Sequence, residues 1–309
     1  MSHPAADRDE AEQHFADSVL KLRAASPPAS FADRDLAGAV RPGSALTGQR
    51  CLELFDAQLA SRHLDLAARW LRKIGAGFYT IGSSGHEGNA AVAAALRMDD
   101  PALLHYRSGG FYCARARQVP GVDPVRDVLL GVAASADEPI AGGRHKVFGR
   151  AELAIVPQTS TIASHLPRAL GVALGIGRAA KLGVVCPWPR DAVTVASFGD
   201  ASASHSTAVG AINAACHTAY QGIPVPLLLV CEDNGIGISV RTPDGWIRQA
   251  KKRWAWQSGY GDRRCAKAVA TSPSAWRRPR SSTLDCRHPR STIGNSRGRS
   301  ARGGRARRR

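Results

Sequence analysis

Two short apolar runs that flank a helical stretch constrain the fold of this chain more than any other feature. The first run, AVTVASF, occupies residues 192–198, and the second, PLLLVC, occupies residues 226–231. Between them, from about Thr207 to Tyr220, the sequence has a helical pattern. Continuous apolar runs are typical of strands that are buried on both faces, as in parallel sheets. The order predicts a β-α-β unit with a right-handed crossover and with ligands at the carboxyl ends of its strands.

Three further helices are expected upstream of this unit. Residues 49–74 carry apolar side chains near helical spacing, and Gly75 follows them as a typical terminating residue. The Ala-rich stretch from Asn89 to Leu96 predicts a second helix, and the stretch from Leu166 to Leu182 predicts a third. These patterns predict the α/β fold class, with a parallel sheet covered by helices on both faces.

The positive charge of the chain is concentrated at its C-terminal end. The 309 residues have a formal net charge of +17, and residues 248–309 hold 16 Arg and 3 Lys against two Asp. Residues 1–247 are therefore neutral overall. We expect this basic tail to be disordered, because it has too few aliphatic side chains to offset the entropy of ordering. Residues 1–48, which are weakly periodic, are expected to form an extended arm, and residues 49–247 the folded domain.

Two interpretations of the basic tail are open. In the first, it binds nucleic acid through phosphates, with Trp254, Trp256 and Trp276 as stacking groups. In the second, it results from a shift of reading frame after about residue 247, where the composition changes abruptly to residues with GC-rich codons. We favour the second, since the tail has no nucleic-acid-binding motif beyond its charge.

The sequence favours a protein of the cytoplasm. No stretch has the apolar length needed to cross a bilayer. Residues 2–23 contain five acidic side chains and few apolar ones, unlike a signal peptide. The seven cysteines are scattered and include no C-x-x-C pair, so neither a disulfide framework nor a thiolate zinc site is indicated.

Polar side chains follow both strands of the predicted β-α-β unit. Asp200 comes after the first strand and Asn234 after the second. Because parallel strands end at the same edge of a sheet, we expect the two side chains to lie side by side. Oxygen ligands of this kind suit Mg²⁺, particularly when it also binds phosphate, and the helix that begins near Ser204 would direct its N–H groups at the same anion. The alternative is turn chemistry alone, since Gly-Asp and Asn-Gly both favour bends.

Four sequence blocks between about residues 75 and 247 resemble one enzyme family. Residues 197–239, which begin SFGDAS and end CEDNGIGIS, resemble the thiamine diphosphate motif in the alpha subunit of 2-oxo acid dehydrogenase E1 components. That motif is Gly-Asp-Gly, a long spacer and Asn. HYRSGGFYCARA (105–116) resembles the family's Tyr-Arg segment, and GSSGHEGNAAVAAAL (82–96) its Gly-x-Glu helix start. Residues 142–175 are similar to its Gly-Lys/Arg-Gly-Arg segment, its Ser-Ser-Pro-Leu segment and the following helix, nearer the branched-chain type.

The resemblance implies a set of site residues. Asp200 and Asn234 would bind Mg²⁺ through their side chains, and Ile236 through its backbone carbonyl. Tyr106 and Arg107 would hold the diphosphate, for which a hydroxyl and a planar guanidinium are suitable donors. The other implied cofactor contacts are Ser160 and Ile162 at the aminopyrimidine and at the bend of the cofactor, and Gly199, Ala201 and Ser202 in the turn after the strand.

The chain departs from the family pattern at several positions. Ala201 stands where the family usually has glycine, and His205 stands where a Glu is common. The spacer that leads to Asn234 is longer than usual. Nothing in residues 248–309 resembles the family's further strands and its loop that closes over the diphosphate, so the fold is expected to be incomplete at the C-terminus.

The activity implied by the resemblance is oxidative decarboxylation of a 2-oxo acid, with thiamine diphosphate and Mg²⁺ as cofactors and acyl transfer to the lipoyl group of an E2 acyltransferase. A branched-chain substrate is slightly favoured over pyruvate. In this family the activating glutamate comes from a beta-type subunit or a fused beta-like half, so we expect an oligomer and an inactive isolated chain. The alternatives are a transketolase-like carboligase and an inactive fragment with a nucleic-acid-binding tail.

Overall fold

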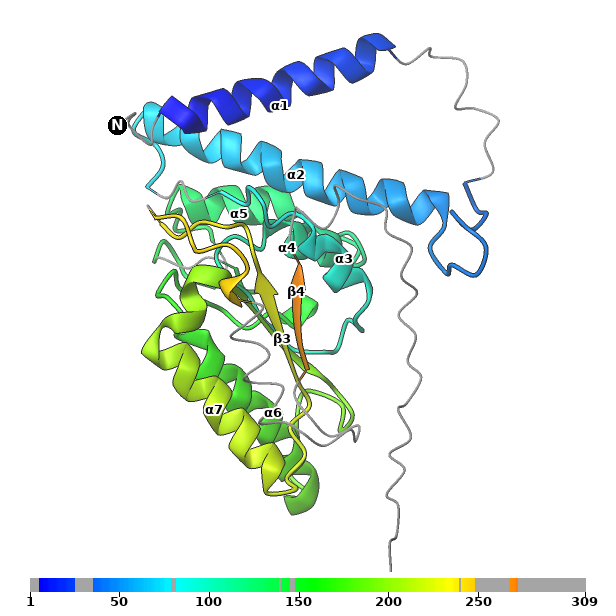
Figure 1. Ribbon diagram of the computed structural model, residues 1–309, viewed down its shortest axis with the longest axis vertical. Coiled ribbons are helices and arrows are strands. Elements are labelled where there is room, and N and C mark those ends of the chain that lie inside the picture. The colour runs from blue at the N-terminus through cyan, green and yellow to red at the C-terminus, as the bar shows by residue number, and fades with distance from the viewer. Residues whose placement is uncertain are drawn as a thin grey trace, which may run out of the picture.

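The computed structural model describes residues 6–25, 36–78, 82–138, 140–144, 148–238, 240–247 and 267–271. At its centre is a parallel sheet with the strand order β1-β2-β3-β4, in which β1 is Ala102–Leu103 and β4 is Lys267–Thr271 (Figure 1). The predicted β-α-β unit is confirmed and consists of β2 (Thr194–Gly199), α7 (Ser206–Tyr220) and β3 (Leu227–Glu232). Gly199 is paired with Glu232, so β2 and β3 end at the same edge of the sheet.

The side chains of β2 alternate between two apolar cores. Ala196 and Phe198 lie in the core that α6 (His165–Leu182) and α7 cover. Val195 lies in the core formed with α2 (Gly48–Lys73), α3 (Asn89–Ala94) and α4 (Gly109–Ala116). In β3, Leu229 and Val230 alternate in the same way. Figure 1 shows α6 and α7 on one side of the sheet and α2 to α5 on the other. The predicted α/β fold with helices on both faces is therefore confirmed, and it explains why the strands are continuously apolar.

The predicted helices are present with slightly different ends. The longest, α2 (Gly48–Lys73), begins after Thr47, whose hydroxyl accepts the N–H of Arg50. Gly75, with φ of +76°, lies just beyond its last turn, where a glycine tolerates this left-handed conformation. The other elements on either side of the sheet are α3 (Asn89–Ala94), β1 (Ala102–Leu103), α4 (Gly109–Ala116), α5 (Pro124–Val132), η1 (Ala151–Leu153), α6 (His165–Leu182) and η2 (Asp200–Ser204).

The expectation of an extended arm is wrong for part of residues 1–48, because α1 (Ala6–Ala25) is a helix. Figure 1 shows α1 next to α2 at one end, with the two helices diverging toward the C-terminal end of α1. Phe15 of α1 meets His63 of α2 edge-on with ring centroids 6.3 Å apart, and the guanidinium of Arg62 lies over the Phe15 ring. Most of the described side chains of α1 are exposed. A helix that buries few side chains has weak apolar periodicity. Because helices are predicted from that periodicity, α1 was not recognised in the sequence.

The expectation of disorder in residues 248–309 is wrong for β4 (Lys267–Thr271). This strand pairs with β3 in parallel, with Leu228 opposite Lys267. The edge of a sheet offers unpaired N–H and C=O groups to any extended segment. Backbone pairing therefore does not need the aliphatic side chains whose scarcity predicted disorder. The remaining tail residues, including Trp254, Trp256 and Trp276, lie outside the described ranges.

Among the described residues, no helix is both long enough and apolar enough to span a bilayer.

Candidate active site

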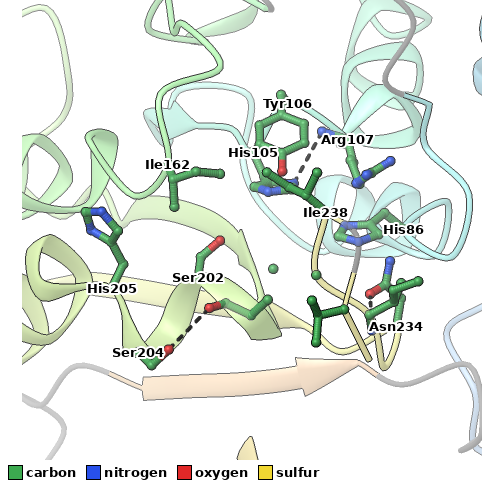
Figure 2. Close-up of a pocket in the computed structure, with 15 residues that line it drawn as sticks. His86, His105, Tyr106, Arg107, Ile162, Ser202, Ser204, His205, Asn234 and Ile238 are labelled. Carbon is green, nitrogen blue, oxygen red and sulfur yellow. Dashed lines mark hydrogen bonds between the residues drawn. The ribbon is translucent and has the colours of Figure 1, made fainter. Parts of the chain in front are cut away.

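A pocket of about 450 Å³ opens where β1, β2 and β3 end (Figure 2). Residues 105–107 reach it from the end of β1, residues from 199 to 205 from the end of β2, and residues from 234 to 240 from the loop after β3. His86 reaches it from the loop before α3. The carboxyl ends of three parallel strands thus converge on one pocket, as expected for ligand sites in α/β proteins.

Asp200 lies directly after β2, and its side chain is buried. Thr242 donates its hydroxyl hydrogen to Oδ2 of Asp200 at 2.5 Å. The other carboxylate oxygen, Oδ1, is buried and has no hydrogen-bond partner among the described residues. An unpartnered buried carboxylate oxygen is costly, and a divalent cation would satisfy it. Asp200 is not among the residues that line the pocket, whereas its neighbours Gly199 and Ala201 are. Its unpartnered Oδ1 nevertheless has the chemistry of a magnesium ligand.

Asn234 and Ile236 line the pocket from the loop after β3. Oδ1 of Asn234 accepts the N–H of Ile236 at 3.2 Å, which is the turn chemistry that the sequence left open as an alternative. The amide oxygen has a second lone pair, so the same atom can also bind a cation. Gly85 packs against this side chain, since a Cβ built on Gly85 would lie 3.0 Å from Cβ of Asn234.

Tyr106 and Arg107 follow the end of β1, and both are half-buried in the wall of the pocket. Nη1 of Arg107 donates to the carbonyl oxygen of Gly82 at 2.6 Å, and its guanidinium carbon lies 5.5 Å from the centroid of the Tyr106 ring. These contacts fix the plane of the guanidinium but use only part of its N–H groups. The arrangement suits a phosphate ligand.

The turn after β2 brings backbone and a helix end to the pocket. Gly199, Ala201 and Ser202 line it, and α7 begins shortly after them. His205 is the N-cap of α7, because its Nδ1 accepts the N–H of Thr207 at 3.2 Å. The N-terminus of a helix of this length attracts anions through its free N–H groups and its dipole.

A family model described as "Dehydrogenase E1 component" matches residues 57–253. The chain belongs to the dehydrogenase E1 component family. Among solved structures, transketolase from Campylobacter jejuni subsp. jejuni NCTC 11168 is similar, with 11% sequence identity and a TM-score of 0.44. The match covers 72% of this chain and 38% of the transketolase chain, so this chain spans well under two thirds of that protein. No curated protein matches the chain.

Membership of the E1 family points to thiamine diphosphate as the cofactor and supports a 2-oxo acid dehydrogenase E1 component. The groups at the carboxyl ends of the strands fit such a ligand. Asp200 offers an unpartnered carboxylate oxygen for a cation, and Arg107 offers N–H groups for phosphate oxygens. The family thus agrees with the chemistry of the side chains.

Two further residues implied by the E1 resemblance differ in where they lie. Ile162 lines the pocket (Figure 2), whereas Ser160 is half-buried and is not among the lining residues.

The methyl group of Ala201, which replaces the glycine usual in the E1 motif, faces Gly237. A Cβ built on Gly237 would lie 3.3 Å from Cβ of Ala201, so the glycine makes room for the methyl group.

A buried polar cluster in the wall of the E1-family pocket was not predicted from the sequence. Nδ1 of His86 pairs with Oε2 of Glu232, whose Oε1 accepts a hydrogen bond from Asn89 at 3.0 Å. The rings of His86 and His105 are nearly parallel, with centroids 5.3 Å apart. Burial, followed by the charge of His86, lowers the pKa of His105 well below its usual value. The sequence does hold a signal for this cluster, because His105 and Glu232 are polar residues at the ends of buried strands: His105 follows β1, and Glu232 ends β3.

The loop that carries Gly85 is held by side chains of α2. Oδ2 of Asp65 accepts the N–H and the hydroxyl of Ser83 at 2.8 and 2.9 Å. Glu87 accepts the N–H of Gly85 at 2.8 Å. Nη1 of Arg62 lies 3.1 Å from Oδ2 of Asp65, and Nε of Arg62 lies 3.8 Å from Oε1 of Glu87. Burial raises the pKa of both carboxyl groups. The E1-family pocket is thus positioned from the helix on one side as well as from the sheet.

Proposed function

We propose that this chain is the cofactor-binding part of an E1 component that catalyses oxidative decarboxylation of a 2-oxo acid, with thiamine diphosphate and Mg²⁺. The observation that carries the proposal is Oδ1 of Asp200, a buried carboxylate oxygen without a hydrogen-bond partner at the end of β2. The chain belongs to a family with this cofactor, and Asn234 follows the neighbouring strand, β3. Turn chemistry alone does not account for an unpaired buried carboxylate oxygen.

In this proposal each group at the carboxyl end of the sheet has one task. Asp200 and Asn234 bind Mg²⁺ through side-chain oxygens, and Ile236 binds it through its backbone carbonyl. Tyr106, Arg107 and the N-terminus of α7 donate hydrogen bonds to the diphosphate. Gly199, Ala201 and Ser202 bring backbone close to it, Ile162 supports the bend of the cofactor, and Ser160 contacts the aminopyrimidine.

The cofactor, when bound, supplies the carbanion chemistry of decarboxylation. The chain binds and orients it and excludes water from it. A beta-type subunit or a fused beta-like half supplies the remaining catalytic groups, the acyl group passes to a lipoyl-bearing E2, and the isolated chain is inactive. We propose a branched-chain substrate, supported by the resemblance of residues 142–175, and the cytoplasm as the compartment.

Binding of thiamine diphosphate to the 309-residue chain, measured by calorimetry with and without Mg²⁺, tests the proposal. We expect saturable binding that needs Mg²⁺ and that is lost in Asp200→Asn, which keeps the shape of the side chain but removes its charge. Asp244→Asn, at an exposed position in the same region, is the control and should bind as the wild type does. Binding that is equal with and without Mg²⁺, or unchanged in Asp200→Asn, would contradict the proposed site.

A second experiment tests the need for a partner. The chain alone should release no CO₂ from a 2-oxo acid, and addition of a beta-type subunit should restore release. Comparison of a branched-chain 2-oxo acid with pyruvate then gives the substrate preference. Activity of the chain by itself would show that the proposed division of catalytic groups is wrong.

A further inference from the structure

His105 carries a hydrogen-bond donor that the described residues leave unused. Its Nδ1 accepts the backbone N–H of Arg107 at 3.3 Å, shown by a dashed line in Figure 2. Its own backbone N–H donates to Oγ of Ser197 at 2.9 Å, which holds the residue against β2. A neutral imidazole has one N–H and one lone pair. Because Nδ1 is the acceptor, the hydrogen atom is on Nε2.

The imidazole of His105 is kept neutral by its surroundings. The residue is 4% exposed, and burial lowers its pKa, with a further contribution from the charge of His86. Nε2 of His105 is buried and has no hydrogen-bond partner in the part of the chain that the structure describes. A buried N–H without an acceptor is unfavourable, so this atom marks a position where an acceptor is expected.

Gly199 leaves space beside this donor. The nearest neighbour of a Cβ built on Gly199 would be Nε2 of His105, at 3.6 Å, followed by two ring carbons of His105 and His86. An additional atom therefore fits between the end of β2 and the imidazole N–H. His105 and Gly199 both line the pocket, together with Arg107. The space therefore lies in the same pocket as the Arg107 guanidinium, which we propose holds phosphate oxygens.

We propose that Nε2–H of His105 donates a hydrogen bond to a phosphate oxygen of a diphosphate bound in this pocket. The inference rests on the proposed function and adds a binding residue to it. His105 would be a neutral donor in the same pocket as the guanidinium of Arg107. Its Nδ1 bond to the backbone of Arg107 fixes the tautomer, so the donor is oriented before the ligand arrives.

A metal ion is the competing occupant of this cluster. Ligand atoms of His86, His105 and Glu232 all lie within 4.8 Å of one another. The existing hydrogen bonds argue against a metal, because the carboxylate of Glu232 already accepts from His86, Asn89 and Ser108. The free nitrogen of His105 also carries a hydrogen atom rather than a lone pair. A phosphate oxygen requires no change in either group.

The test compares His105→Asn with His105→Gln in the full chain. Asparagine places its amide near the position of Nδ1, whereas the longer glutamine places an N–H near the position of Nε2. Calorimetry in Mg²⁺ uses three ligands: thiamine diphosphate, inorganic diphosphate and thiamine. We expect about 10- to 100-fold weaker binding of both diphosphates to His105→Asn, because a hydrogen bond to a charged group is lost. His105→Gln should bind them within about threefold of the wild type, and thiamine should bind all three proteins equally.

Each other outcome has a definite meaning. Equal binding of inorganic diphosphate to the wild type and His105→Asn would overturn the inference, even if thiamine diphosphate binds and the proposed function stands. Binding of inorganic diphosphate that depends on His105, without binding of thiamine diphosphate, would support the inference and contradict the proposed function. Binding of neither ligand by the wild type would overturn both.

Two measurements on the wild type keep the inference testable if the variants do not fold. With ¹⁵N-labelled histidine, addition of Mg²⁺ and diphosphate should give one imidazole Nε2–H signal with a scalar coupling to ³¹P. Absence of that coupling in the saturated complex would overturn the inference. Stoichiometric binding of Zn²⁺ through His105 in the absence of diphosphate would also overturn it, because the nitrogen would then be a metal ligand.

Discussion

Thr242 donates its hydroxyl hydrogen to Oδ2 of Asp200 at 2.5 Å, and this bond joins two segments that lie 42 residues apart in the chain. It holds the carboxylate so that Oδ1 is the oxygen left for another partner. Groups that orient a metal ligand often affect metal affinity strongly although they do not touch the ion. Thr242 is therefore expected to control the magnesium site that we propose.

Thr242→Val should weaken Mg²⁺-dependent binding of thiamine diphosphate by about 10-fold, because valine keeps the shape of threonine but cannot donate to Asp200. Thr242→Ser keeps the hydroxyl and should bind within about threefold of the wild type. A titration of Mg²⁺ at saturating thiamine diphosphate measures the difference. If valine and serine weaken binding equally, the hydroxyl does not orient the carboxylate.

Gly85→Ala should also weaken Mg²⁺-dependent cofactor binding. Gly85 has φ of +84°, and an added Cβ would lie 3.0 Å from Cβ of Asn234, so the substitution strains the loop and displaces the amide. Gly88→Ala is the matched control, since Gly88 has φ of −59° and no atom within 4 Å of an added Cβ. We expect a loss of about 10-fold or more for Gly85→Ala and little change for Gly88→Ala. Loss of the same size in both variants would assign the effect to the loop in general.

Folding stability should fall as the pH decreases through the range where an unfolded histidine titrates. Burial lowers the pKa of His165 below 6.5, while its Nε2 donates to the carbonyl oxygen of Ser197 at 2.7 Å. Well above pH 6.5 the imidazole of His165 is neutral in both the folded and the unfolded chain, and the full stability is present. Below it the unfolded chain binds a proton that the folded chain resists, so stability is lost by at most about 1.4 kcal/mol per pH unit for this group.

The variant His165→Gln isolates this contribution, because glutamine can keep the bond to Ser197 but does not titrate. Urea unfolding of the wild type and the variant between pH 7.5 and 5 measures the difference. The wild type should lose stability more steeply than His165→Gln as the pH falls. Parallel curves would mean that His165 does not contribute to acid sensitivity.

The backbone amides of β4 that point toward β3 should be protected from hydrogen exchange, because β4 is the edge strand and pairs with β3 from Leu228 to Glu232. Val269→Pro removes one N–H from this strand and should increase exchange in both β4 and β3. Val269→Thr keeps the N–H and should leave exchange unchanged. Exchange of residues 267–271 at the rate of an unstructured peptide would show that the pairing does not persist in solution.

Patterns that depend on near neighbours in the chain were sufficient for the β-α-β unit and for the helices on both sides of the sheet. The runs at 192–198 and 226–231 are apolar because helices cover both faces of β2 and β3, and this burial is visible in sequence. The same rule, together with the family resemblance, led to Asp200 and Asn234, which directly follow the strands. Sequence patterns did not predict α1 or β4. The α1 helix is poorly buried and therefore has little apolar periodicity, and β4 is held by backbone pairing, which does not depend on side-chain pattern.

The sequence by itself determined the fold class, the edge of the sheet that forms the pocket, and the residue types available for a cation and a phosphate. The tertiary structure alone decided which oxygen of Asp200 is free, because Thr242 reaches it from a distant loop. It also decided that His86, His105 and Glu232 form one buried cluster. Such contacts arise between segments far apart in the chain, and hydrogen bonding and burial there depend on three-dimensional packing that local patterns do not encode.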